Sequence, residues 1–373
     1  MLPRVKINFE NGALGGMAAI DDGVIGLIMY GHEIPTKYEQ GSSYKITSLD
    51  DLASMGITAA LNDDNAPLYA QVSDIYAEAP VGTVVWLMCS SSSSDILSRI
   101  GDAKNLLRAA GGAISILVFG DGDSASPAVV AELQAVGVWA ADVLFAPVLV
   151  LMGTSSYSAM YNPSTYQANR VCAVMGGGNV PCVGLLAGRI AAIPVHRSVA
   201  RVKDGMVKKT SILLSGLPID GFDLPGISDA GYISFRTFVG KGGYYFTDDK
   251  TATDAADDYS SIARRRTIDK AYRIAYGMLV NELSSEIAVT NEGAISAPIA
   301  KSIQNAVETA IENGMAGSLG VDPGDAKDTG VQCYIDVNQN IVSTGKLNVS
   351  LRIKPFGYAK YIDLSLGFKT TTT

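Results

Sequence analysis

The sequence is poor in charged residues, in histidine and in closely spaced cysteines, and each shortage excludes a class of function. Asp, Glu, Lys and Arg make up 18% of the 373 residues, whereas 47% are hydrophobic. Soluble proteins contain about 25% charged residues, and disordered chains combine low hydrophobicity with high charge. The net charge of −8 is also unsuited to nucleic acid binding. We therefore expect a folded chain that covers part of its surface by association.

The sequence gives little support for a metal site, a cofactor site or a catalytic nucleophile. The histidines, His32 and His196, stand alone, and no C-x-x-C pair of the kind that binds zinc is present. The cysteines lie in or beside apolar runs, which predicts buried reduced thiols. The sequence therefore predicts no catalytic residue, no metal site and no cofactor. The four cysteines are Cys89, Cys172, Cys182 and Cys333.

Long apolar runs are also missing. The longest, residues 143–152, contains Pro147 and is about half of the roughly 20 residues that a membrane helix needs. The N-terminal residues lack the apolar core of a signal peptide. We expect a protein that is made in the cytoplasm and does not insert into a membrane.

Residues 19–200 alternate between strand-like and helix-like segments. Helix starts are indicated by Ser48, by Ser94 and by Ser126 followed by proline. Such alternation predicts an α/β domain with a buried, partly parallel sheet. The expected strands are residues 24–30, 83–89, 114–119, 143–152 and 181–186.

The pattern changes near residue 200 and predicts a C-terminal α+β domain over residues 201–355. It begins with two strands, 232–239 and 244–247, and a long helix over residues 254–283. A second helix follows Ser296, with one apolar stripe. Three alternating strands, starting near Val331, Leu347 and Ile362, complete an antiparallel sheet.

Both ends of the chain are amphipathic strands beside turn residues, so we treat residues 1–18 and 356–373 as arms. An exposed strand invites pairing with another chain, and a strand from one subunit can complete the sheet of its neighbour. Glycine provides a hinge at Gly12, Gly15 and Gly16. The apolar faces of the two arms are Val5, Ile7 and Phe9, and Ile362, Leu364, Leu366 and Phe368.

The remaining motifs do not form an enzyme site. Gly176-Gly177-Gly178-Asn179 is expected to precede a strand, whereas a phosphate loop opens a helix. The serines at 90–94 lack the G-x-S-x-G elbow. Acidic pairs near residues 248 and 257 could hold a divalent cation, but acids at the start of the long helix also complement its dipole.

Arg264-Arg265-Arg266, followed by Asp269, Lys270 and Arg273, is the most unusual local feature. It is interpreted either as a solvated helix face or as an electrostatic patch that orients a partner.

The sequence resembles the contractile tail sheath proteins of bacteriophages and of phage-tail-like injection machines. An ordered series of segments carries the resemblance, mainly between residues 235 and 368. The segments are 190–198 (IAAIPVHRS), 243–249 (GYYFTDD), 265–272 (RRTIDKAY), 291–295 (NEGAI), 336–342 (DVNQNIV), 355–362 (PFGYAKYI) and 366–368 (LGF).

The resemblance implies a sheath subunit with an outer α/β domain and a C-terminal α+β domain, whose arms mesh with neighbouring copies. It further implies polymerisation around an inner tube protein, contraction that drives the tube through an envelope, and contacts with baseplate and tail terminator proteins. The particle would be a virion tail or an injection device assembled in the bacterial cytoplasm. Candidate contacts with the tube are Arg264, Arg265 and Arg273 on the long helix and Lys301, Glu308 and Glu312 on the next one.

Two other readings remain open. One is a static tube, capsid or surface-layer protein that polymerises through the same strand exchange. The other is a small-molecule enzyme on the α/β domain, which the missing acid–base pairs disfavour.

Overall fold

A computed structural model describes residues 21–31, 33–61, 67–90, 95–157, 160–178 and 180–368. The chain divides into two compact units, Met1–Val280 and Asn281–Thr373. The predicted boundary near residue 200 is therefore misplaced. Residues 201–280 belong to the first unit because they add to its sheet: the Met175 amide donates to the Ile233 carbonyl at 2.8 Å, and Phe235 is fully buried.

A six-stranded sheet with the order β2-β3-β1-β4-β5-β7 forms the centre of the first unit. All of its strands are parallel except β2, which pairs antiparallel with β3 at the edge. The parallel strands are buried almost throughout, as a sheet between two helical layers requires. The strands are β1 (Ile25–Tyr30), β2 (Ser43–Ile46), β3 (Val85–Ser90), β4 (Ile116–Phe119), β5 (Leu149–Thr154) and β7 (Val171–Met175).

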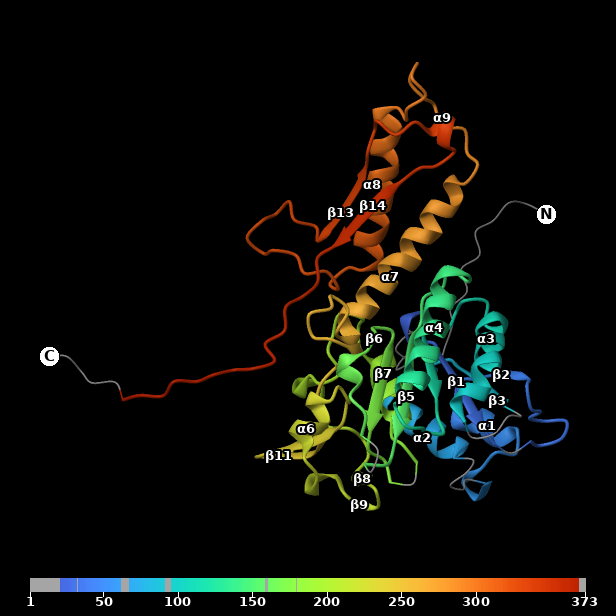
Figure 1. The fold of residues 1–373 in the computed structure, drawn as a ribbon, viewed down its shortest axis with the longest axis vertical. Coiled ribbons are helices and arrows are strands. Elements are labelled where there is room, and N and C mark those ends of the chain that lie inside the picture. Colours follow the sequence, from blue (N-terminus) through green and yellow to red (C-terminus); the bar gives the residue numbers. More distant parts are fainter. Residues whose placement is uncertain are drawn as a thin grey trace, which may run out of the picture. The chain divides into compact units, whose positions relative to one another are not determined.

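Helices flank this sheet, with α2 packed against α5 and α3 packed against α4 (Figure 1). Ser48 caps α1 by accepting from the Asp51 amide, and Ser126 caps α4 by accepting from the Val129 amide. Both starts confirm the prediction. The third start is Asp95, which caps a short 3-10 turn before α3. The helices are α1 (Leu49–Ser54), α2 (Leu68–Glu78), α3 (Ile100–Ala109), α4 (Pro127–Asp142) and α5 (Val183–Ala192).

Two predicted strands are wrong in type or extent. Residues 181–186 lie in the turn before α5 and in its first residues, and almost every residue of that helix is buried. The apolar run 143–152 becomes strand only from Leu149, because its first residues form the turn and connection that follow α4. Strand β7 was not predicted.

The contact between α2 and α5 depends on two glycines. A Cβ atom on Gly184 would lie 2.6 Å from the Gln71 carbonyl oxygen, and one on Gly188 would collide with the Ile75 carbonyl oxygen. The absence of both side chains lets the two helix backbones approach closely.

Gly188→Ala is therefore expected to lower the free energy of unfolding by about 2–3 kcal/mol, because neither backbone can yield without cost. Gly101→Ala is the matched control, since Gly101 also lies in a helix but has open space around it. We expect the control to be neutral or stabilising by up to about 1 kcal/mol. Urea denaturation measures both, and equal effects would contradict the close approach.

Several remaining segments of the first unit lie next to β7, at one edge of the sheet. Strands β10 (Phe235–Phe238) and β11 (Lys241–Phe246) form the predicted antiparallel hairpin. Short strand pairs join β6 (Gln167–Ala168) to β12 (Ala252–Thr253) and β8 (Leu213–Leu214) to β9 (Leu217–Pro218). Two helices complete it, α6 (Leu224–Asp229) and α7 (Ile262–Leu279).

The second unit packs one helix on a two-stranded antiparallel sheet. Helix α8 (Ala297–Gly314) buries Ile303, Val307 and Ile311, and the facing strand buries Cys333 and Ile335. The sheet consists of β13 (Val331–Ile335) and β14 (Val349–Ile353), and the short helix α9 (Ile341–Thr344) lies between them in the chain. The predicted helix and two of the three predicted terminal strands are confirmed. The third, near residues 362–368, is assigned no strand.

Candidate functional site

Helix α7 carries the arginine cluster and starts later than predicted. Ser261 caps it by accepting from the Arg264 amide. The acids at 254–258 precede the helix and form turns instead: Asp254 accepts from the Ala256 amide at 2.8 Å and Asp257 accepts from the Tyr259 amide at 2.7 Å. These acids therefore do not complement the helix dipole, which corrects the interpretation from sequence.

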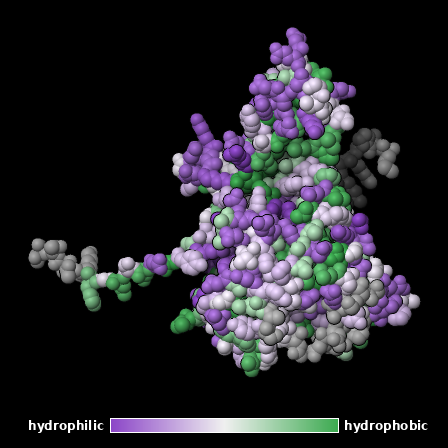
Figure 2. Space-filling model, in the orientation of Figure 1, coloured by the Kyte–Doolittle hydropathy of each residue, from purple (hydrophilic) through white to green (hydrophobic). Residues whose placement is uncertain are grey.

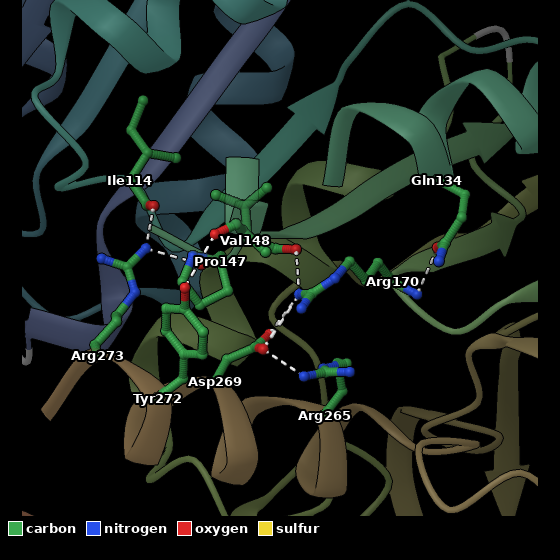
Figure 3. Close-up of polar contacts among 10 residues, drawn as sticks. Ile114, Gln134, Pro147, Val148, Arg170, Arg265, Asp269, Tyr272 and Arg273 are labelled. Atoms are coloured by element: carbon green, nitrogen blue, oxygen red, sulfur yellow. Dashed lines mark hydrogen bonds and ion pairs between the residues drawn. The ribbon is translucent and has the colours of Figure 1, made fainter. Parts of the chain in front are cut away.

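Asp269, on the inner face of α7, pairs with two buried arginines, one on the same helix and one outside it (Figure 3). Its carboxylate accepts from Arg170 at 3.0 and 3.1 Å and from Arg265 at 2.6 Å. All three residues are less than 10% exposed. Burial lowers the pKa of Arg170, and the Asp269 carboxylate opposes that shift. Because Arg170 precedes β7, this triad fixes α7 to the sheet.

Arg273 extends the attachment to the amino-terminal ends of β4 and β5, and Tyr272 extends it to the end of α4 (Figure 3). Arg273 donates to the carbonyl oxygens of Gly112 and Ile114, both at 2.7 Å, and of Pro147 at 2.8 Å. The Tyr272 hydroxyl donates to the Ala141 carbonyl at 3.1 Å. Helix α7 thus satisfies carbonyl groups in the segments before β4 and β5 and one in the last turn of α4.

The arginine cluster is consequently an internal element of the first unit, and the interpretation as a solvated helix face is wrong. Arg265 and Arg266 are 8% and 5% exposed, and Arg273 is half-buried with three backbone partners. The side chains of Arg265 and Arg273 are engaged inside the subunit, so they lend no support to the predicted tube contact. Arg264 remains half-exposed.

The other predicted tube contacts lie on α8 in the second unit. Lys301 is exposed and Glu312 is half-buried. Glu308 accepts from the Cys333 amide at 2.8 Å, which ties α8 to β13. Contact of these residues with a tube stays a prediction.

The C-terminal arm is the most exposed apolar segment of the described chain. Tyr361, Leu366 and Phe368 expose 87%, 91% and 103% of their reference surface, and Ile362 and Leu364 exceed 80%. Figure 2 shows the hydrophobic side chains of this segment uncovered. The N-terminal arm residues Val5, Ile7 and Phe9 and the hinge residues Gly12, Gly15 and Gly16 lie outside the described residues.

Open α/β sheets bind ligands where the order of the strands reverses, because the connections from two adjacent strands there run to opposite faces of the sheet. Here that position lies at the carboxyl ends of β1 and β4. Protein groups occupy it: Arg99 forms an ion pair with Asp121, and the Tyr30 amide donates to the same carboxylate at 2.9 Å. The Arg99 side chain is fully buried. An internal ion pair therefore stands where an α/β enzyme would place its substrate.

Burial raises the pKa of Asp121 to about 6, and Arg99 and the Tyr30 amide offset only part of this shift. An unfolded aspartate has a pKa of about 3.9, so the folded state holds this proton more tightly. The contribution of Asp121 to stability should thus fall as the pH rises from about 4 to about 6. Relative to Asp121→Asn, the wild type is expected to lose about 2 kcal/mol of unfolding free energy between pH 4.5 and 7.5. Urea denaturation at several pH values measures this, and a constant difference between the two proteins would refute it.

The glycine loop does lie between a strand and a helix, contrary to the prediction. It connects β7 to α5, but its amides are already used: Gly177 and Gly178 donate to the Leu213 carbonyl at 2.7 and 3.1 Å. The Gly184 amide in the first turn of α5 donates to the Gln71 side chain at 2.9 Å. The amides of Gly177, Gly178 and Gly184 are therefore not available to hold a phosphate.

The cysteines are buried, and the possible metal ligands of the described residues are dispersed. All four cysteines are buried thiols, as predicted, and burial raises the pKa of Cys89 to about 11. Within the described part of the chain, no three His, Cys, Asp or Glu residues gather as a metal site would require. None of the helices described there is both long enough and apolar enough to span a membrane.

Comparison with known proteins identifies the family. A family model for the DUF2586 N-terminal domain matches residues 2–250, and one for the DUF2586 C-terminal domain matches residues 258–373. The chain belongs to the DUF2586 family. No curated protein sequence matches this DUF2586 chain significantly.

Solved structures share the fold of the DUF2586 chain over nearly its whole length. A chain of the anti-feeding prophage baseplate is 15% identical and covers 99% of both chains, with a TM-score of 0.64. The contracted PVC sheath complex of an extracellular contractile injection system is 15% identical, covers 98% of this chain and 97% of its own, and has a TM-score of 0.63. The sheath tail protein of Desulfitobacterium hafniense is 11% identical, covers 94% and 100%, and has a TM-score of 0.59. The DUF2586 chain thus has the fold of contractile tail sheath proteins.

Proposed function

We propose that this DUF2586 chain is the subunit of a contractile sheath, which polymerises helically around an inner tube and drives that tube through a cell envelope. The observation that carries the proposal is the exposed C-terminal arm. Its apolar side chains alternate with polar ones and would be costly to leave in water. A sheet edge on a neighbouring copy would cover them and satisfy their backbone groups.

Contraction requires subunits that move without detaching. Backbone pairing between arms tolerates rotation about a flexible connection, and the glycines at 12, 15 and 16 would supply one at the other end of the chain. The contacts of α7 with the sheet would let the first unit move as a single body. The free energy would then come from contacts between subunits that improve in the contracted state.

The partners that follow are copies of this chain, an inner tube protein, and baseplate and terminator proteins at the two ends. The particle would be a virion tail or a related injection device assembled in the bacterial cytoplasm. The candidates for tube contact are Arg264, Lys301, Glu308 and Glu312, which remain at least partly exposed in the subunit. No catalytic residue is part of this proposal, because an internal ion pair fills the ligand position of the sheet.

Electron microscopy of the purified protein, alone and with its tube protein, tests the proposal. We expect helical tubes in two forms that differ in length and diameter. One fixed lattice would instead favour the static tube, capsid or surface-layer reading. A small oligomer that persists at all concentrations would contradict both.

A further inference from the structure

Helix α7 and the amino-terminal edge of the sheet enclose a small cavity inside the first unit. Its lining includes Val195, Arg266, Lys270 and Arg273, together with the carboxylates of Asp22 and Asp269. The cavity volume is about 20 Å³, counted as the space open to the centres of water-sized spheres, and the cavity is open in part to solvent. One water molecule needs about 10–15 Å³, so the cavity has room for a group as small as a carboxylate.

The charges around this cavity do not balance. Lys270 pairs with Asp22 at 2.7 Å. Asp269 is already shared by Arg170 and Arg265. Both acids are therefore already paired with other cations. Among the described residues Arg266 and Arg273 donate to backbone carbonyls and not to a carboxylate, although Asp22 attracts both of them and Asp269 attracts Arg273 from a greater distance.

Arg266 is the least satisfied member of the lining. It is 5% exposed, and its two terminal nitrogens donate to a single oxygen, the Ile193 carbonyl, at 3.3 and 3.4 Å. A guanidinium has five N–H donors, and an uncompensated buried charge is costly. Burial lowers the pKa of Arg266 to about 10, so the side chain is still cationic at neutral pH.

The pKa of His196 also reports an excess of positive charge in this region. Burial lowers its pKa, and the charges of Arg197, Arg266 and Arg201 lower it further. Arg197 and Arg201 both pair with Asp204, so their nearest acid is also engaged. A negative group in the cavity would offset several of these cations at once.

We propose that the cavity beneath α7 is a binding site for a carboxylate, with Arg266 as its principal ligand and with Lys270 and Arg273 adding positive charge. The planar fork of an arginine matches the two oxygens of a carboxylate. The carboxylate is either an Asp or Glu side chain of a second copy of this chain, whose net charge of −8 leaves acids in excess, or a free carboxylate ion.

Thermal unfolding of the unassembled subunit in sodium acetate tests the site, with sodium chloride at equal ionic strength as the reference. We expect acetate at about ten times its Kd to raise the Tm by about 2 °C. Arg266→Met should remove this rise while leaving the protein folded, since it replaces an unpaired buried charge by an apolar group. Arg264→Gln is the matched control and should keep the rise, because Arg264 lies on the same helix outside the lining.

The proposal is overturned if acetate has no effect beyond that of chloride, or if Arg266→Met responds as the wild type does. Should Arg266→Met fail to fold, Arg266→Lys keeps the charge without the fork and should bind acetate at least about tenfold more weakly by calorimetry. Equal affinity of this variant and the wild type would likewise overturn it.

A second experiment, which rests on the proposed function, identifies the source of the carboxylate. If a neighbouring copy supplies it, acetate binding by the wild type should disappear in assembled polymers; if a free ion fills the site, binding should persist there. The acetate experiment on the unassembled subunit does not require polymerisation, so its failure is distinct from a failure to polymerise.

Discussion

Deletion of residues 361–373 should abolish polymerisation while leaving a folded subunit. All of residues 361–368 are exposed, so their removal should change the folding free energy of the monomer little. Covering an apolar side chain contributes about 1.5 kcal/mol or more. For Ile362, Leu364, Leu366 and Phe368 together this is about 6 kcal/mol, or about 10⁴-fold in the critical concentration for assembly.

Sedimentation and electron microscopy measure this concentration, and the thermal midpoint reports folding. Replacing the four apolar residues by serine should have nearly the full effect of the deletion. The matched control changes the alternate positions, Asp363→Ser with Ser365→Ala, and should assemble normally. Deletion of residues 1–12 tests the other arm and should also give a folded subunit that cannot polymerise. Normal tubes from both truncations would refute the arms as connectors.

Asp269→Ala should lower the free energy of unfolding by about 3–5 kcal/mol, because it leaves the buried guanidinium groups of Arg170 and Arg265 without a counter-charge. The loss should detach α7 from the sheet edge, which makes the amides of β4 and β5 exchange faster with solvent. Urea denaturation and hydrogen exchange measure the two effects.

Arg201→Ala is the matched control for Asp269→Ala, since it removes the more exposed pair with Asp204 and should cost less than about 1 kcal/mol. Replacing the whole triad by apolar residues, Arg170→Met, Arg265→Met and Asp269→Leu, should recover most of the stability. A loss below 1 kcal/mol for Asp269→Ala would show that the triad does not hold the helix. Charge reversal at Arg265 and Arg273 should therefore unfold the subunit before it can report on a tube contact.

Local sequence signals identified the elements that have their own start signals or a clear period. Ser48 and Ser126 mark real helix starts, and the apolar runs at β1, β3 and β4 are strands because a parallel sheet buries both faces. The same reasoning failed at residues 181–186. In α5 nearly every residue is buried, so the sequence shows no helical period that would distinguish it from a strand.

The arginine cluster shows a second limit of local reasoning. Arg170 and Asp269 are 99 positions apart in the chain, and the carbonyl groups that Arg273 contacts are more than 120 positions away. A triple arginine on an amphipathic helix is typical of a solvated face. Only the path of the chain reveals that the face lies against unpaired backbone.

The sequence by itself determined that this protein has little charge to keep its surface in water, isolated histidines, no C-x-x-C pair, and an alternation of apolar and polar residues at its ends. Those properties depend on composition and on short-range alternation, which the chain carries wherever it folds. The tertiary structure alone decided that the first unit extends to residue 280, that the ligand position of the sheet is closed by Arg99 and Asp121, and that the arginines of α7 face inward. Each of these depends on which distant groups are brought together, and in each case a buried charge or carbonyl group must find its partner there.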